Sequence, residues 1–150
     1  MKDQHNAYQL LGRWWRERRC PIINGIIDVR ERLVRVAAGA APTRFSFGES
    51  LSEAYSKGAL EFTTITEMID ETATDAGRNL RAYCGEGGFG GDGFVALCWA
   101  DTDKPIWIAF FETSNPFVSV SLHANCVVAQ TTLDRKWTFP LEEPEKFAVE

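Results

Sequence analysis

The sequence has no long hydrophobic run. Its longest apolar stretches lie near residues 94–100 and 106–111, and both are much shorter than the roughly 20 residues that a helix needs to cross a membrane. The first residues also lack an apolar segment followed by a small-residue cleavage site, so no secretory signal is predicted. We therefore expect a cytoplasmic protein that does not bind a membrane.

Residues that bind metals are few and widely spaced. The chain has 2 histidines and 4 cysteines, and neither a C-x-x-C nor an H-x-x-x-H spacing occurs. A structural zinc site needs four clustered ligands, so we expect no metal and no other cofactor. Without a predicted secretory signal, buried free thiols are favoured over disulfides for all of the cysteines, which are Cys20, Cys84, Cys98 and Cys126.

Positive charge is concentrated in the N-terminal segment. Residues 1–44 carry a net charge of +5, whereas residues 45–150 carry −10 and the whole chain carries −5. Arginines beside Trp14 and Trp15 could suggest nucleic-acid binding, but both tryptophans fall on the apolar stripe of a predicted helix. The net negative charge disfavours nucleic acid as a partner, and pairing of the basic segment with the acidic remainder is the simpler interpretation.

A glycine-rich segment, residues 85–90, matches the G-x-G-x-x-G pattern of dinucleotide-binding loops. Such a loop must follow a strand and lead into a helix, whose N-terminus binds the phosphate. Here a helix is expected before the loop and a strand after it, so a flexible connector is favoured. Asp92, in the same loop, is expected to be solvated.

A catalytic alternative combines the Gly85–Gly93 loop with Cys98 or His123. A thiol nucleophile needs a base within hydrogen-bonding distance, and Cys126 lies three residues after His123. That spacing places the two side chains on opposite faces of one strand, unless a turn at Asn125 changes it. A small cytosolic enzyme is therefore the alternative, and a non-enzymatic protein is preferred.

Asp101, Asp103 and Glu112 superficially match the carboxylates of a metal-dependent nuclease at strand ends. Such sites use a lysine shortly after the glutamate, and Thr113 and Ser114 stand there instead. We therefore interpret these acids as turn residues beside a hairpin.

The expected fold centres on residues 94–124, the densest apolar and aromatic part of the chain. Strands are predicted over 94–100 and 106–113, each apolar on both faces, and over 117–123, where one face is wetter. Two further strands, 126–131 and 136–141, complete an antiparallel meander of about five strands.

Helices are expected before this sheet. Apolar periodicity predicts two helices, over residues 7–15 and 23–37. Capping-box patterns predict a short helix over 51–57 and a longer one over 65–83. The prediction is a single α+β domain over residues 1–150, with N-terminal helices (1–84 mainly helical) packed on a C-terminal antiparallel β-meander (94–141).

Residues 106–120, IWIAFFETSNPFVSV, lie at the centre of a run of apolar and aromatic strands over 94–131. This run resembles the C-terminal sheet of small bacterial immunity proteins from contact-dependent growth inhibition and related polymorphic toxin systems. The resemblance covers about a quarter of the chain. It implies a cytoplasmic, non-enzymatic inhibitor that binds a cognate toxin domain, often a nuclease, and occludes its active site.

Toxins of this kind are frequently basic because their substrates are polyanions, so an acidic inhibitor would associate quickly through electrostatic steering. Two acidic sets are candidates for the toxin-binding surface. The first lies on the helix expected over 65–83 and comprises Glu67, Asp70, Glu71 and Asp75. The second lies at the hairpin ends and comprises Asp101, Asp103 and Glu112. Solvated acids without a partner are the alternative for both sets.

Overall fold

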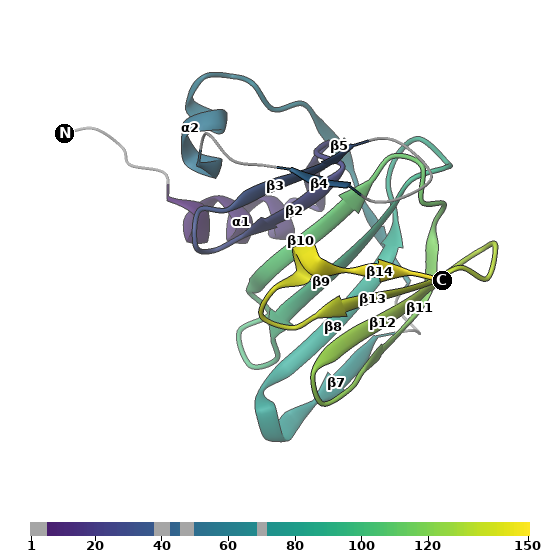
Figure 1. The fold of residues 1–150 in the computed structure, drawn as a ribbon. Helices are drawn as coiled ribbons and strands as arrows, with labels where there is room; N and C mark the ends of the chain where they lie inside the picture. The colour runs from purple at the N-terminus through teal and green to yellow at the C-terminus, as the bar shows by residue number, and fades with distance from the viewer. Residues whose placement is uncertain (1–5, 38–42, 46–49, 69–71) are drawn as a thin grey trace.

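The computed structural model describes residues 6–37, 43–45, 50–68 and 72–150 (Figure 1). Strands dominate this part of the chain. Its α-helices are α1 (Ala7–Arg16) and α2 (Leu51–Ser56), and its short 3-10 helices are η2 (Ala76–Arg78) and η3 (Pro144–Lys146).

The largest element is an antiparallel sheet that the described residues form with eight strands. Its strand order is β4-β3-β2-β10-β9-β8-β6, and β7 also pairs with β8. Its strands are β2 (Gly25–Asp28), β3 (Leu33–Ala37), β4 (Thr43–Phe45), β6 (Thr66–Glu67), β7 (Ala73–Asp75), β8 (Leu80–Glu86), β9 (Gly93–Trp99) and β10 (Pro105–Phe111).

Two smaller sheets accompany it. One is four-stranded and antiparallel, in the order β11 (Phe117–Leu122), β12 (Cys126–Thr131), β13 (Lys136–Pro140) and β14 (Ala148–Val149). The other is a two-stranded ribbon of β1 (Arg19–Pro21) and β5 (Phe62–Thr64). The helices lie on one side of the large sheet and the four-stranded sheet on the other (Figure 1). The structure therefore has two apolar cores, a helix-side core and a sheet-side core.

Strands β9 and β10 fill both cores at once, because successive side chains of a strand point to opposite faces. The helix-side core takes Phe94, Ala96, Cys98, Ile108 and Phe110. The sheet-side core takes Val95, Leu97, Trp107, Ala109 and Phe111. Each of these side chains is at most 5% exposed. The prediction that both strands are apolar on both faces is confirmed.

The predictions of helices near residues 7–15 and 51–57 are also confirmed. Asn6 caps α1, and its capping box with Gln9 has both of its hydrogen bonds. Ser50 caps α2 by accepting a hydrogen bond from the backbone N–H of Glu53 at 3.2 Å. The buried tryptophans of α1, Trp14 and Trp15, lie in the helix-side core and not on the surface.

One carboxylate fastens both helices to the large sheet. Glu31, in the turn between β2 and β3, accepts hydrogen bonds from the backbone N–H groups of Ala7 and Ser52, in the first turns of α1 and α2. Negative charge near a helix N-terminus is favourable, because the first backbone N–H groups have no partner within the helix. The turn therefore positions the helical layer.

The predicted helix over residues 23–37 is wrong. These residues form the β2–β3 hairpin, in which Ile26 pairs with Val34 and Ile27 with Leu33. The first pair faces the sheet-side core and the second faces the helix-side core. Two short strands and the turn between them thus place apolar residues three and four positions apart in the sequence, which is also the spacing of an amphipathic helix. Glu31 has a left-handed backbone (φ 69°), and a helix interior excludes that conformation.

The predicted helix over residues 65–83 is also wrong. Its described residues form β6, β7, η2 and the start of β8, and residues 69–71 lie outside the described part of the chain. Leu80, Ala82 and Cys84 enter the sheet-side core at every second position, which is the period of a strand. Residues 1–84 are therefore not mainly helical.

The predicted single meander is wrong as well. The strands within 94–141 are antiparallel, but they divide between two sheets. β10 has β9 on one edge and β2 on the other, so β11 cannot pair with it and instead begins the four-stranded sheet. The α+β expectation of helices packed on a five-stranded meander is thus replaced by a mostly β architecture, in which the helices cover one face of the large sheet.

Two glycines allow a matched stability test. A Cβ on Gly25 would lie 1.8 Å from the carbonyl oxygen of Val34 on the neighbouring strand, whereas a Cβ on Gly12 in α1 would meet nothing within 4 Å. We expect Gly25→Ala to lower the free energy of unfolding by about 3 kcal/mol or more. Gly12→Ala should raise it by up to about 1 kcal/mol, because alanine favours the helix. Urea unfolding of both variants measures this, and equal effects would contradict the described packing of β2 on β3.

Candidate functional site

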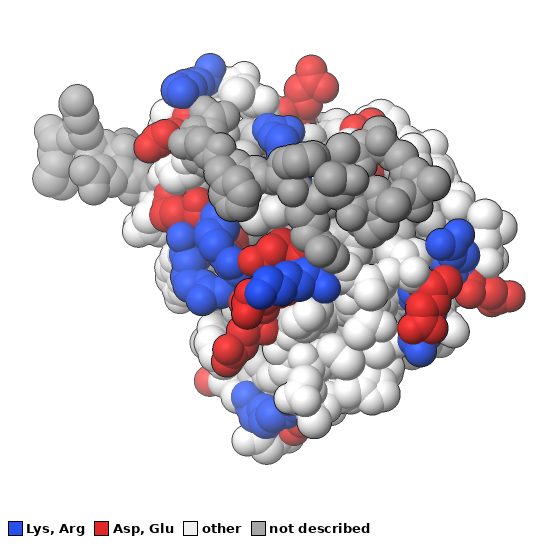
Figure 2. Space-filling model, viewed as in Figure 1, with Lys and Arg blue, Asp and Glu red and all other residues white. Residues whose placement is uncertain are grey.

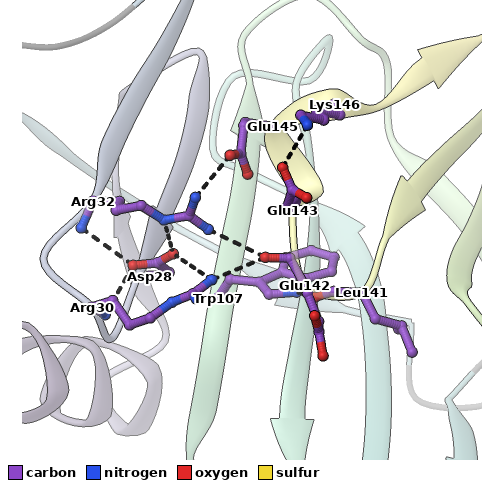
Figure 3. A network of polar contacts seen from close by, with 9 residues as sticks. All are labelled: Asp28, Arg30, Arg32, Trp107, Leu141, Glu142, Glu143, Glu145 and Lys146. Atoms are coloured by element: carbon purple, nitrogen blue, oxygen red, sulfur yellow. Dashed lines mark hydrogen bonds and ion pairs between the residues drawn. The ribbon is translucent and has the colours of Figure 1, made fainter.

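The densest charged network joins the β2–β3 turn to the segment around η3 (Figure 3). The carboxylate of Asp28, 3% exposed, accepts hydrogen bonds from Nε of Arg32 at 2.5 Å and from the backbone N–H of Arg30 at 2.9 Å. Arg32 also forms an ion pair with Glu145 at 2.8 Å, and Arg30 donates to the carbonyl oxygen of Glu142 at 2.9 Å. Contacts with both acids raise the pKa of Arg32, although burial alone would lower it.

This network is a seam between the large sheet and the segment that leads to β14 of the four-stranded sheet. The indole N–H of Trp107, on β10, donates to the carbonyl oxygen of Leu141 at 2.9 Å in the same place. Figure 2 shows charged side chains of both signs gathered there, whereas much of the face below them carries no charge. The carboxylates and guanidinium groups of the seam bind one another. The seam therefore serves to attach the C-terminal segment to the β2–β3 turn.

The first predicted acidic set does not form one surface. Glu67, on β6, pairs with Arg18 at 3.2 Å. Asp75, at the end of β7, pairs with Arg78 at 2.7 Å, and hydrogen bonds from Arg78 lower the pKa of its carboxyl. Asp70 and Glu71 lie outside the described residues. The described residues between 65 and 83 form no helix that could align the four acids. Each of the two described acids, Glu67 and Asp75, is paired with an arginine.

The second acidic set is held differently. Asp101 accepts a hydrogen bond from the amide of Asn79 at 3.0 Å, and Glu112 accepts one from the amide of Asn24 at 2.6 Å. Asp103 accepts one from the hydroxyl of Tyr83. Among the described residues, no ion pair joins any of these three carboxylates to a cation. Neutral donors therefore orient all three carboxylates, and Asp103 in addition lies close enough to Arg81 to help Tyr83 raise the pKa of that guanidinium.

These three acids are not all neighbours. Asp101 and Asp103 lie in the turn between β9 and β10, whereas Glu112 follows the last residue of β10. A seven-residue strand separates the two places, which corresponds to about 24 Å at 3.4 Å per residue. The prediction of a hairpin turn is confirmed for Asp101 and Asp103, whereas Glu112 precedes a connection between two sheets and lies at the opposite end of the large sheet.

The residues of the enzymatic alternative are not brought together either. Cys98 is fully buried in the helix-side core, and burial raises the pKa of its thiol well above the ordinary value. The Gly85–Gly93 segment lies at the opposite end of β9, and His123 belongs to the β11–β12 turn of the other sheet. His123 contacts Ser121, whose Oγ lies 2.9 Å from its Nε2. None of the four cysteines forms a disulfide, as predicted, and Cys20, Cys84 and Cys98 are buried whereas Cys126 is half-buried.

The glycine-rich loop is an ordered turn between β8 and β9, so a strand and not a helix precedes it. Asp92 is fully buried, which corrects the expectation that it is solvated. Its carboxylate accepts hydrogen bonds from the backbone N–H groups of Gly87 at 3.1 Å and Phe89 at 3.2 Å. The backbone N–H of Gly88 donates to Thr63 at 3.1 Å. A Cβ on Gly87 would lie 2.2 Å from this carboxylate, so glycine permits the close approach.

The outer face of the four-stranded sheet matches the prediction of a wetter face. Along β12 exposed or half-buried residues alternate with buried ones, because one face covers the sheet-side core. Along β11 only Phe117 is buried, which corrects its predicted place on the wetter face, and the other residues are half-buried or exposed. The outward side chains of the paired positions are Ser119, Ser121, Val128 and Gln130.

No helix in the described ranges has the length and apolar character required to span a bilayer. Those ranges also contain no group of three or more histidine, cysteine, aspartate or glutamate side chains placed to hold a metal ion. Comparison of the chain with protein-family models, with curated proteins and with solved structures gave no match.

Asp92→Asn tests the role of the buried carboxylate in the glycine-rich loop. The amide cannot accept both backbone hydrogen bonds, so we expect the free energy of unfolding to fall by about 1–3 kcal/mol. Asp134→Asn is the matched control: Asp134 is an exposed turn residue with φ 59°, a conformation that asparagine tolerates, and its change should stay within about 0.5 kcal/mol. Urea unfolding measures the free energy of unfolding of both variants. If the two variants lose the same amount of stability, Asp92 does not hold the loop.

Tyr83→Phe tests the contact that orients Asp103. Burial, together with the hydrogen bond to Asp103, raises the pKa of Tyr83 to about 12. At pH 8 the wild type should be more stable than the variant by about 2 kcal/mol, because the hydrogen bond joins a charged acceptor. Between pH 10 and 12 this difference should shrink, since the unfolded tyrosine ionises near 10 and the folded one near 12. Urea unfolding at a series of pH values measures the difference, and a constant gap would contradict the raised pKa.

Proposed function

We propose that this chain is an immunity protein, which binds a cognate toxin domain with nuclease activity and blocks its active site. The observation that carries the proposal is the state of Asp101, Asp103 and Glu112, whose carboxylates are fixed by neutral donors. Among the described residues none of these acids forms an ion pair, so a basic partner can bind them without first displacing a cation.

This arrangement suits a basic partner. A nuclease that binds a polyanion presents cations around its active site, and a chain with a net charge of −5 would attract that region from a distance. Because side chains that are already oriented lose little freedom on binding, they favour association more than mobile surface acids do. The resemblance of residues 94–131 to immunity proteins agrees with this mode of action by contact.

The direct test uses the reading frame immediately upstream of the gene. It should encode a large secreted protein whose C-terminal domain stops growth when it is expressed alone. Co-expression of this chain should restore growth, and the two proteins should purify as a complex of fixed stoichiometry with no nuclease activity. An upstream frame without a toxic domain, or toxicity that this chain does not relieve, would refute the proposal.

Ionic strength tests the electrostatic part. The association rate constant of the toxin domain and this chain should fall by about tenfold or more between 10 mM and 500 mM sodium chloride, because the Debye length shrinks from about 30 Å to a few ångströms. The dissociation rate constant should change much less. Stopped-flow fluorescence measures both rates, and an association rate that is independent of salt would exclude steering by charge.

A further inference from the structure

Three loops meet at one end of the molecule, and we call this surface the loop end. It comprises the Gly87–Asp92, Ser114–Pro116 and Thr132–Arg135 loops. The backbone N–H of Asn115 donates to the carbonyl oxygen of Gly91 at 2.8 Å, and that of Thr132 donates to Pro116 at 3.1 Å. The middle loop thus connects the two outer ones, and the β8–β9 and β12–β13 turns lie on the same side of the molecule in Figure 1.

The two outer loops are held in the same way, each by one buried polar side chain. Asp92, fully buried, accepts hydrogen bonds from the N–H groups of Gly87 and Phe89. Thr131, 1% exposed, accepts them from Leu133 at 3.3 Å and Arg135 at 3.2 Å. A buried polar group is costly unless it is hydrogen-bonded, and here both groups satisfy backbone donors of their own loop. Both loops therefore have a fixed backbone.

Each fixed loop exposes one large apolar side chain. Phe89 is 62% exposed and Leu133 is 67% exposed, which makes them the most exposed large apolar residues of the described chain. Their own backbone N–H groups are the ones that Asp92 and Thr131 bind. The structure thus holds two apolar side chains in water on rigid supports, an arrangement that lowers the entropy cost of binding.

We propose that the loop end is the surface that docks on the toxin domain, with Phe89 and Leu133 as its apolar anchors. This inference rests on the proposed function and adds the place of contact. A partner fits if it offers apolar recesses for the two side chains and basic residues around them, because Glu86, Glu112 and Asp134 lie within or close to the three loops in the chain.

Charge argues against a second copy of this chain as the occupant. A two-fold interface brings each surface against itself, so these acids would face one another. Two cations border the same loop: Arg135 donates to the backbone carbonyl oxygen of Glu150 and keeps its charge, whereas Lys136 forms an ion pair with the Glu150 carboxylate at 3.7 Å. The three acids therefore outnumber the one guanidinium that could face them across the two-fold axis. A basic partner has no such conflict.

The size of a typical interface indicates that the partner contacts the loop end and not also the opposite end of the large sheet, where Asp101 and Asp103 lie. A stable interface buries about 800 Å² on each partner, roughly a tenth of the 7823 Å² accessible surface of this chain. A circular patch of that area centred on the loop end has a radius of about 16 Å. The turn with Asp101 and Asp103 lies about 24 Å away along β10 and therefore outside it. The exposed tyrosine near that turn, Tyr8, is already in contact with Lys104, whose Nζ donates to its hydroxyl at 3.1 Å.

The test compares anchor variants with variants at the far end, using the toxin domain encoded upstream as the probe. The Phe89→Ala/Leu133→Ala double variant should raise the dissociation rate constant by about 30-fold or more, the effect of losing hot-spot residues. Trp99→Ala is the matched control, because Trp99 is also an exposed large apolar residue (42%) but lies near the Asp101 turn. It should change this rate less than threefold. Both side chains of the double variant are exposed, so its urea midpoint should match that of the wild type.

Charge variants give a second, independent measurement. Glu112→Gln, at the loop end, should lower the association rate constant at low salt by more than the Asp101→Asn/Asp103→Asn pair does, although the pair removes more charge.

If the wild type binds and Trp99→Ala or the aspartate pair weakens the complex more than the anchor and Glu112 variants, the loop end is not the docking surface, and the immunity function stands. If the wild type does not bind the toxin domain at all, the proposed function fails and this inference fails with it.

Discussion

The structure depends on the burial of β9 and β10 on both faces. Each strand delivers alternate side chains to the helix-side and sheet-side cores, so neither face of the large sheet can be left in water. Fully burying a large apolar side chain is worth about 1.5–3 kcal/mol, and seven of the ten buried hydrophobic residues on these two strands carry one: Phe94, Val95, Leu97, Trp107, Ile108, Phe110 and Phe111. A helical layer on one side and a second sheet on the other follow from this requirement.

Polar contacts then decide how the covering layers attach. Glu31 binds the first turns of both helices, and the seam around Asp28 attaches the segment that leads to β14. Both carboxylates belong to the β2–β3 hairpin. This hairpin also closes the free edge of β10, so one short element positions the helices, the C-terminal segment and the large sheet. The candidate contacts with a partner lie in the turns, and buried polar side chains fix the backbone of two of them.

The candidate site was only partly accessible to sequence reasoning. Asp101 and Asp103 could be placed in a turn, because a polar run between two apolar strands is a local signal. Asp92 was misjudged, because nothing in a glycine-rich segment indicates that its carboxylate is buried under two backbone N–H groups. Phe89 and Leu133 carry no local signal either: an apolar residue in a loop can turn inward or outward, and the neighbouring loops decide which.

The sequence by itself determined α1, α2 and the two-sided character of β9 and β10, since capping residues and alternation act over a few residues. Tertiary structure decided the rest. Over residues 23–37 the apolar spacing fitted a helix, and pairing of Ile26 with Val34 across a turn made it a hairpin. Whether β11 could extend the sheet depended on β2, which is more than 80 residues earlier in the chain and occupies the edge of β10. The spacing of apolar residues along the chain indicates only the local period of a helix or strand. Which strand pairs with a given edge depends on contacts between segments that are far apart in the sequence.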